Sequence, residues 1–123
     1  MRYLGVDFGI KRMGLAISEG ELASPWRVIE GIGPKFLLQV LKKEALNFDK
    51  IIIGLPEGKM GEVVMKVIVD LEENGFNVEA ADETLSSQKA SKEMVELNVP
   101  KKKRRINDAT AASIILQDYL DNQ

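Results

Sequence analysis

Short apolar runs separated by turn residues fill the first third of the chain, a pattern typical of strands joined by hairpins. Residues 3–6 and 13–18 are two such runs, and the connection 9–12 between them is short enough for a hairpin. A third run, 22–30, contains Pro25, which is poorly tolerated in a central strand. We therefore expect three antiparallel hairpin strands, the third at the edge of a sheet.

The periodicity then changes, and two more apolar runs alternate with helical spacing. The run 51–53 is short, β-branched and apolar on both faces, which predicts a parallel strand covered by helices. Residues 76–81 predict a fifth strand. Apolar residues at three- and four-residue spacing predict helices over 34–48, 63–71, 90–97 and 108–120, the last with Asn107 as its N-cap. Between the strand 51–53 and the helix 63–71, Gly58 and Gly61 predict a loop at the carboxyl end of the strand, where open α/β sheets bind ligands.

This order predicts an α/β fold with a mixed five-stranded sheet. Three antiparallel hairpin strands and two parallel strands would form the sheet, with helices on both faces. The length of 123 residues fits a single domain, residues 1–123. The sequence shows neither a transmembrane span nor a signal peptide, so we expect a cytoplasmic protein with no membrane partner.

Composition removes several kinds of chemistry. The chain contains no Cys and no His, which excludes disulfides, thiolate nucleophiles and the commonest zinc ligand. An enzyme built from this sequence must use carboxylates, lysines or a bound metal.

Three carboxylates at the ends of different predicted elements are the candidate site. Asp7 follows the first strand, Glu83 follows the fifth, and Asp108 begins the last helix. Converging acids repel one another unless a cation lies among them, and oxygen ligands without His or Cys select Mg²⁺ or Mn²⁺. Two such ions activate water and stabilise the leaving oxygen of a phosphodiester without a protein base. Each acid also has a local explanation: a turn at Asp7, a solvated strand end at Glu83, and the helix dipole at Asp108.

Positive charge is concentrated just before the last helix. The net charge of the chain is −2, but five of its 17 basic residues form one uninterrupted run. The rest of the chain has 12 basic and 19 acidic residues. That run is a candidate nucleic-acid contact, with a solvated loop as the alternative. It consists of Lys101, Lys102, Lys103, Arg104 and Arg105.

Five motifs in order along nearly the whole chain resemble the YqgF family of RNase H-fold proteins, relatives of the Holliday-junction resolvases. The motifs are Asp7-Phe8-Gly9, Lys11-Arg12 followed by Gly14-Leu15-Ala16, Ile52-Ile53-Gly54-Leu55-Pro56, Asp82-Glu83 with Leu85-Ser86-Ser87, and Asp108 leading into Ala112, Ile114-Ile115-Leu116-Gln117 and Tyr119-Leu120.

The resemblance implies an RNase H-like topology and a nuclease with the acidic triad Asp7, Glu83 and Asp108. It also implies a substrate, either the 5′ end of precursor 16S ribosomal RNA or branched DNA such as a Holliday junction. We assign Lys11 and Arg12, with the basic run, to nucleic-acid binding. A monomer or a weak homodimer is expected.

The chain departs from the family pattern at three places. Thr84 stands where the family usually has an arginine, a natural phosphate ligand. Asn107 replaces an apolar residue before the last acid, and the loop after Pro56 is shorter than usual. Thr84 favours the alternative of a noncatalytic nucleic-acid-binding protein with the same fold, acting in transcription or ribosome assembly. Asp7-Phe8-Gly9 also resembles the first phosphate motif of the actin-like ATPases, so half of a nucleotide-binding kinase or ATPase is a second alternative. Those proteins bind ATP between two such domains, and 123 residues supply only one.

Overall fold

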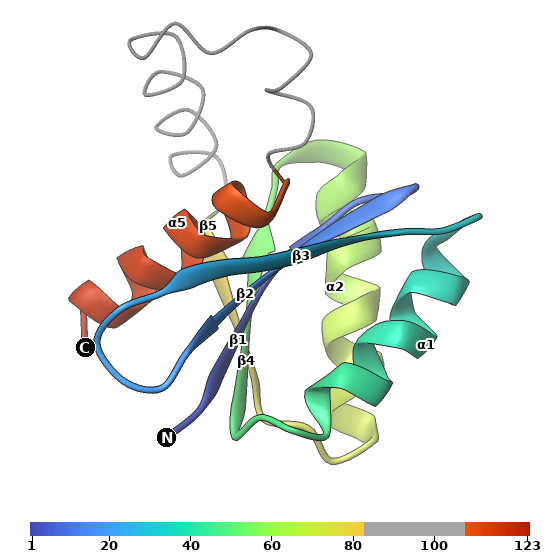
Figure 1. Cartoon of the computed structure of the whole chain (residues 1–123). Coiled ribbons are helices and arrows are strands. Elements are labelled where there is room, and N and C mark those ends of the chain that lie inside the picture. Colours follow the sequence, from blue (N-terminus) through green and yellow to red (C-terminus); the bar gives the residue numbers. More distant parts are fainter. Residues whose placement is uncertain (83–107) are drawn as a thin grey trace, which may run out of the picture.

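A computed structural model describes residues 1–82 and 108–123, which form a five-stranded sheet between two layers of helix (Figure 1). The strand order is β3-β2-β1-β4-β5. β2 pairs antiparallel with β1 and β3, whereas β4 pairs parallel with β1 and β5. This confirms the predicted mixed sheet and the edge position of the third strand. The strands are β1 (Tyr3–Phe8), β2 (Arg12–Ser18), β3 (Ser24–Glu30), β4 (Lys50–Leu55) and β5 (Val78–Asp82).

Helices cover both faces of the sheet, as the apolar run of β4 predicted. α1 (Pro34–Ala45) and α2 (Gly58–Glu73) lie on one face, and α5 (Asp108–Asp121) lies on the other (Figure 1). Side chains alternate between the two faces. In β4, Ile51 and Ile53 belong to the larger core under α1 and α2, while Ile52 packs with Ala112, Ile115 and Leu116 of α5.

Small residues on β1 and β2 let α5 approach the sheet closely. A Cβ at Gly5 would lie 2.8 Å from the Leu116 Cβ and 3.0 Å from the Ala112 carbonyl oxygen. On the neighbouring strand, Ala16 is fully buried against the same helix. Small residues on the two strands thus leave room for the large side chains of α5, such as Ile115 and Leu116.

Several element boundaries differ from the prediction by a few residues. β1 continues to Phe8, so Asp7 lies within the strand and not after it. β5 begins at Val78 because Phe76 closes α2: its N–H donates to the Leu71 carbonyl (3.0 Å), while Gly75 (φ 86°) donates to Glu72.

The predicted loop at Gly58 and Gly61 is wrong, because α2 already begins at Gly58. Gly61 lies in the first turn of that helix, where a Cβ would overlap the Pro56 carbonyl oxygen. The glycine therefore serves close packing of the helix start on the preceding loop, and only Pro56 and Glu57 connect β4 to α2.

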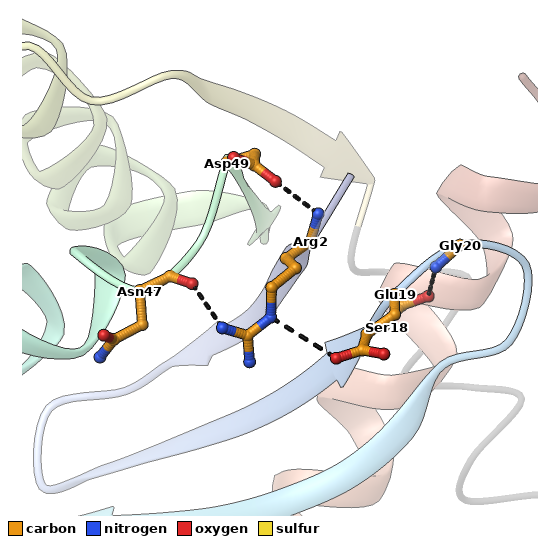
Figure 2. Close-up of polar contacts among 6 residues, drawn as sticks. All are labelled: Arg2, Ser18, Glu19, Gly20, Asn47 and Asp49. Carbon is orange, nitrogen blue, oxygen red and sulfur yellow. Dashed lines mark hydrogen bonds and ion pairs between the residues drawn. The ribbon is translucent and has the colours of Figure 1, made fainter.

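Arg2 ties together the end of the sheet where β1 begins (Figure 2). Its backbone N–H donates to the Asp49 carboxylate (2.7 Å), and its guanidinium donates to the Asn47 carbonyl (2.9 Å). The same guanidinium lies 3.7 Å from the Glu19 carboxylate. These contacts fix the start of β1 against the loop that holds Asn47 and Asp49 and the loop that holds Glu19.

Several predictions lie outside the described residues: the helix over 90–97, the Asn107 N-cap, Glu83, Thr84 and the run 101–105. The single domain stays a prediction as well. Within the described ranges, none of the helices is long and apolar enough to cross a membrane.

Candidate active site

Asp7 and Asp108 are both neighbours of Gly14 on the face of the sheet that α5 covers. In the β1–β2 pair Asp7 is the partner of Gly14, so both positions face α5. A Cβ at Gly14 would overlap the backbone carbonyl of Asp108, the first residue of that helix. The missing side chain is therefore what allows the start of α5 to lie on β2, directly beside Asp7.

The β1–β2 turn completes a pocket of about 450 Å³ around these acids. The Gly9 N–H donates to the Arg12 carbonyl (2.9 Å), and the Gly31 N–H donates to the Lys11 carbonyl (3.0 Å). These bonds hold the backbone of both cationic residues in place. The pocket is lined by Asp7, Gly9, Ile10, Lys11, Arg12 and Asp108.

Asp108 is poorly compensated as an anion. Burial raises the pKa of its carboxyl group, the charges of Asp7 and Glu30 raise it further, and the Arg12 guanidinium lowers it. The Arg12 Nε lies 3.6 Å from Asp108 Oδ2, which makes an ion pair but is too long for a hydrogen bond. Oδ2 is buried and has no hydrogen-bond partner among the described residues.

This environment fits a hard divalent cation. Asp7 and Asp108 supply carboxylate oxygens, the donor type of Mg²⁺ and Mn²⁺, and one of those oxygens is buried without a hydrogen bond. Residues 1–82 and 108–123 contain no group of three acidic, His or Cys side chains that could hold a metal. The described part of the chain thus offers two ligands of the predicted triad.

The third predicted ligand, Glu83, lies outside the described residues, but the strand before it is in place. Asp82 ends β5, and β5 runs parallel to β1 with β4 between them. Two strand spacings separate β1 from β5, which corresponds to about 10 Å. Asp82, the residue before Glu83 in the sequence, therefore lies at the edge of the sheet that carries Asp7. The basic run 101–105 also lies outside the described residues.

Glu30 is a residue of this region that the sequence did not reveal. It ends β3, pairs across the strands with Arg12, and is close enough to Asp108 for its charge to affect that carboxyl group. Only the strand register brings it there. Gly14, by contrast, had a signal, because glycine inside a strand often marks the close approach of another backbone.

The whole chain resembles known nucleases. Residues 1–122 match the family described as "RuvX: Holliday junction resolvase". A protein of Mycoplasmopsis synoviae named "Putative pre-16S rRNA nuclease" is 37% identical, with 98% of each chain covered. A protein of the same name from Clostridioides difficile is also 37% identical, covering 98% of this chain and 94% of its own.

Solved resolvase structures share the fold. The structure "T. thermophilus RuvC in complex with Holliday junction substrate" matches with a TM-score of 0.55 and 21% identity, over 99% of this chain and 94% of RuvC. Fowlpox virus resolvase, in a complex with Holliday junction DNA, matches with a TM-score of 0.62 and 15% identity, over 99% and 98%. The fold is RNase H-like, as predicted, and the match over residues 1–122 shows that this chain belongs to the RuvX family of Holliday junction resolvases.

Proposed function

We propose that this protein is a metal-dependent nuclease that hydrolyses phosphodiester bonds at the 5′ end of precursor 16S ribosomal RNA. The observation that carries the proposal is the pairing of Asp7 and Asp108 in one pocket with Lys11 and Arg12. The substrate rests on the relatives at 37% identity, whose names include pre-16S rRNA nuclease. Branched DNA is the second candidate substrate, because the matching family is described as a Holliday junction resolvase.

In this proposal the acids hold the metal and the cations hold the substrate. Asp7, Asp108 and Glu83 would bind Mg²⁺ or Mn²⁺, which when bound supplies activation of water and stabilisation of the leaving oxygen. Lys11 and Arg12 lie at the rim of the same pocket and suit the phosphate groups on either side of the cleaved bond. The chain needs no histidine base for this chemistry.

The noncatalytic alternative rests on Thr84 alone, and the relatives with nuclease names do not favour it. If the arginine usual at that position contacts phosphate, Thr84→Arg should tighten substrate binding. The cytoplasmic location stays a prediction.

Side-by-side cleavage assays test the proposal. The full-length chain is incubated with a precursor 16S RNA and with a four-way DNA junction, in Mg²⁺, in Mn²⁺ and in a chelator. We expect metal-dependent cleavage of the RNA at a defined 5′ position, and loss of cleavage in Asp7→Asn and Asp108→Asn. Asp121→Asn, at the far end of α5, is the matched control and should retain activity.

Two outcomes would overturn parts of the proposal. Activity that survives the chelator, or survives both Asp7→Asn and Asp108→Asn, excludes the metal mechanism. Cleavage of the junction alone replaces RNA with branched DNA as the substrate. Symmetric junction cutting needs two sites, so light scattering would then have to show a dimer and not the monomer.

A further inference from the structure

Arg12 is surrounded by carboxylates. Its guanidinium lies 3.6 Å from Asp108 Oδ2, and Asp7 lines the same pocket. On the other side, Arg12 is the cross-strand partner of Glu30, at the position where β2 begins and β3 ends. One cation thus stands between the proposed metal ligands and an acid of the edge strand.

The proposed metal and Arg12 would bind the same carboxylate. Asp108 Oδ2 is buried and lies 3.6 Å from the Arg12 Nε, so a divalent cation that binds at this oxygen comes close to the guanidinium. Two like charges at one carboxylate repel each other strongly where water is partly excluded. Binding of one cation therefore weakens binding of the other.

Arg12 is the partner that can move. Asp108 is the first residue of α5, and its backbone packs against Gly14, so the short side chain has little freedom to move away. The Arg12 side chain is 45% exposed, against 32% for Asp108, and it is long and flexible. A displaced guanidinium needs a new counter-charge, and Glu30 is exposed and lies directly across from it.

We propose that Arg12 is the internal counter-ion of Asp108, that it competes with the divalent cation for this carboxylate, and that, as long as no nucleic acid is bound, Glu30 receives Arg12 when the cation binds. The inference rests on the metal-dependent function proposed above. In this scheme Arg12 weakens metal binding and Glu30 restores part of it, so the two positioning residues together set the metal concentration at which the site fills.

Mn²⁺ binding to the full-length chain, without nucleic acid and at constant ionic strength, measures this competition directly. Electron paramagnetic resonance of free Mn²⁺ gives the dissociation constant. Arg12→Gln should lower that constant by about two- to fivefold, the range expected for loss of a partly exposed ion pair. Glu30→Gln should raise it, because Arg12 then loses the carboxylate that lies across from it on β3.

The double variant separates exchange of Arg12 from a general effect of charge. If Glu30 acts through Arg12, Glu30→Gln should have no effect in the Arg12→Gln background. If Glu30 acts only by its field, the two changes will be additive. Lys11→Gln is the matched control, since it removes the same charge from the same turn and should change the constant less than Arg12→Gln.

Each result bears on one of the two proposals. An unchanged or raised Mn²⁺ constant in Arg12→Gln overturns the competition, and additive changes overturn the role of Glu30. Asp108→Asn that leaves Mn²⁺ binding intact overturns the metal site itself, and with it the proposed function. Should Arg12→Gln fail to fold, as judged by circular dichroism, Arg12→Met takes its place, because it also removes the charge but keeps a long side chain.

Discussion

At the scale of single residues, Gly14 determines whether the two acids of the pocket meet. Any side chain there must push the Asp108 backbone off β2, and the shift would move that carboxylate away from Asp7. We expect Gly14→Ala to lower the free energy of unfolding by about 1–3 kcal/mol through overpacking and to abolish Mn²⁺ binding and cleavage.

Gly20→Ala is the matched control for that prediction. Gly20 lies in the exposed β2–β3 loop, and a Cβ there would meet no atom within 4 Å. Its stability should stay equal or rise slightly, since alanine restricts the unfolded chain. Urea unfolding of both variants measures the difference, and a Gly14→Ala protein as stable and active as the parent would refute the packing argument.

Asp108 predicts a pH dependence of stability. Its pKa is raised in the folded chain, mainly by burial, so the native state binds this proton more tightly than the unfolded state does. The contribution of this group to stability is therefore highest below its ordinary pKa of about 3.9 and falls as pH rises through the raised native pKa. Asp108→Asn removes this fall.

Urea unfolding between pH 4 and pH 8, in a chelator, tests the sign. The stability of Asp108→Asn relative to the parent should increase as pH rises through that window, and then level off. A difference that stays constant over the whole range would show that the Asp108 carboxylate carries no burial penalty.

The sequence pointed to two acids that line one pocket, but not to their surroundings. Asp7 lies near the end of the first strand and Asp108 begins the last helix, so both could be selected as candidates from the pattern of apolar and polar residues. The ion pair of Arg12 with Asp108, and the place of Glu30, depend on strand register and on how closely a helix packs. Neither quantity is encoded in local periodicity, because both depend on contacts between residues far apart in the sequence.

At the scale of elements, β4 supports the packing on both faces of the sheet. Ile52 is 0% exposed and lies in the core under α5. Ile52→Ala should lower the free energy of unfolding by about 2–5 kcal/mol through reduced packing and formation of a cavity. Ile32→Ala, at a position 99% exposed, makes the same chemical change and should shift stability by less than about 0.5 kcal/mol. A change below about 1 kcal/mol at Ile52 would contradict a strand buried on both faces.

Element types were predicted more accurately than element boundaries. Short apolar runs correctly indicated five strands, yet β3 contains an irregularity that no pattern indicated. Leu15 pairs with Arg27 and Ala16 with Pro25, which leaves Trp26 as an extra residue in the edge strand. The indole packs edge-on against Phe48, with ring centroids 5.9 Å apart. The extra residue in β3 thus makes a contact with a residue far away in the sequence, which the local pattern of apolar residues does not reveal.

At the scale of the whole molecule, charge is distributed unevenly along the chain. The acids outnumber the bases outside residues 101–105, while those five positions are all basic. In the sequence, Arg105 is only three residues before Asp108, a residue lining the pocket. A nuclease of this charge distribution would attract nucleic acid chiefly at the edge that holds its carboxylates.

Replacing Lys101, Lys102 and Lys103 with Gln tests whether this run grips the substrate. For every phosphate that a protein no longer neutralises, the slope of log affinity against log salt falls in magnitude by about 0.7 for a single strand and about 0.9 for a duplex. We expect the triple variant to flatten the slope by about 2–3 units and to weaken binding for all sequences alike, while cleavage at saturating substrate changes much less.

A matched control removes the same charge elsewhere. Lys35, Lys43 and Lys66 are exposed on α1 and α2, across the sheet from α5, and replacing them with Gln lowers the net charge by the same amount. Their replacement should leave the salt slope nearly unchanged, because only phosphates that the protein touches release counterions. If the salt slope is flattened equally in the two triple variants, the basic run acts through net charge and does not touch phosphate. If the slope is unaltered in both, the run is a solvated loop.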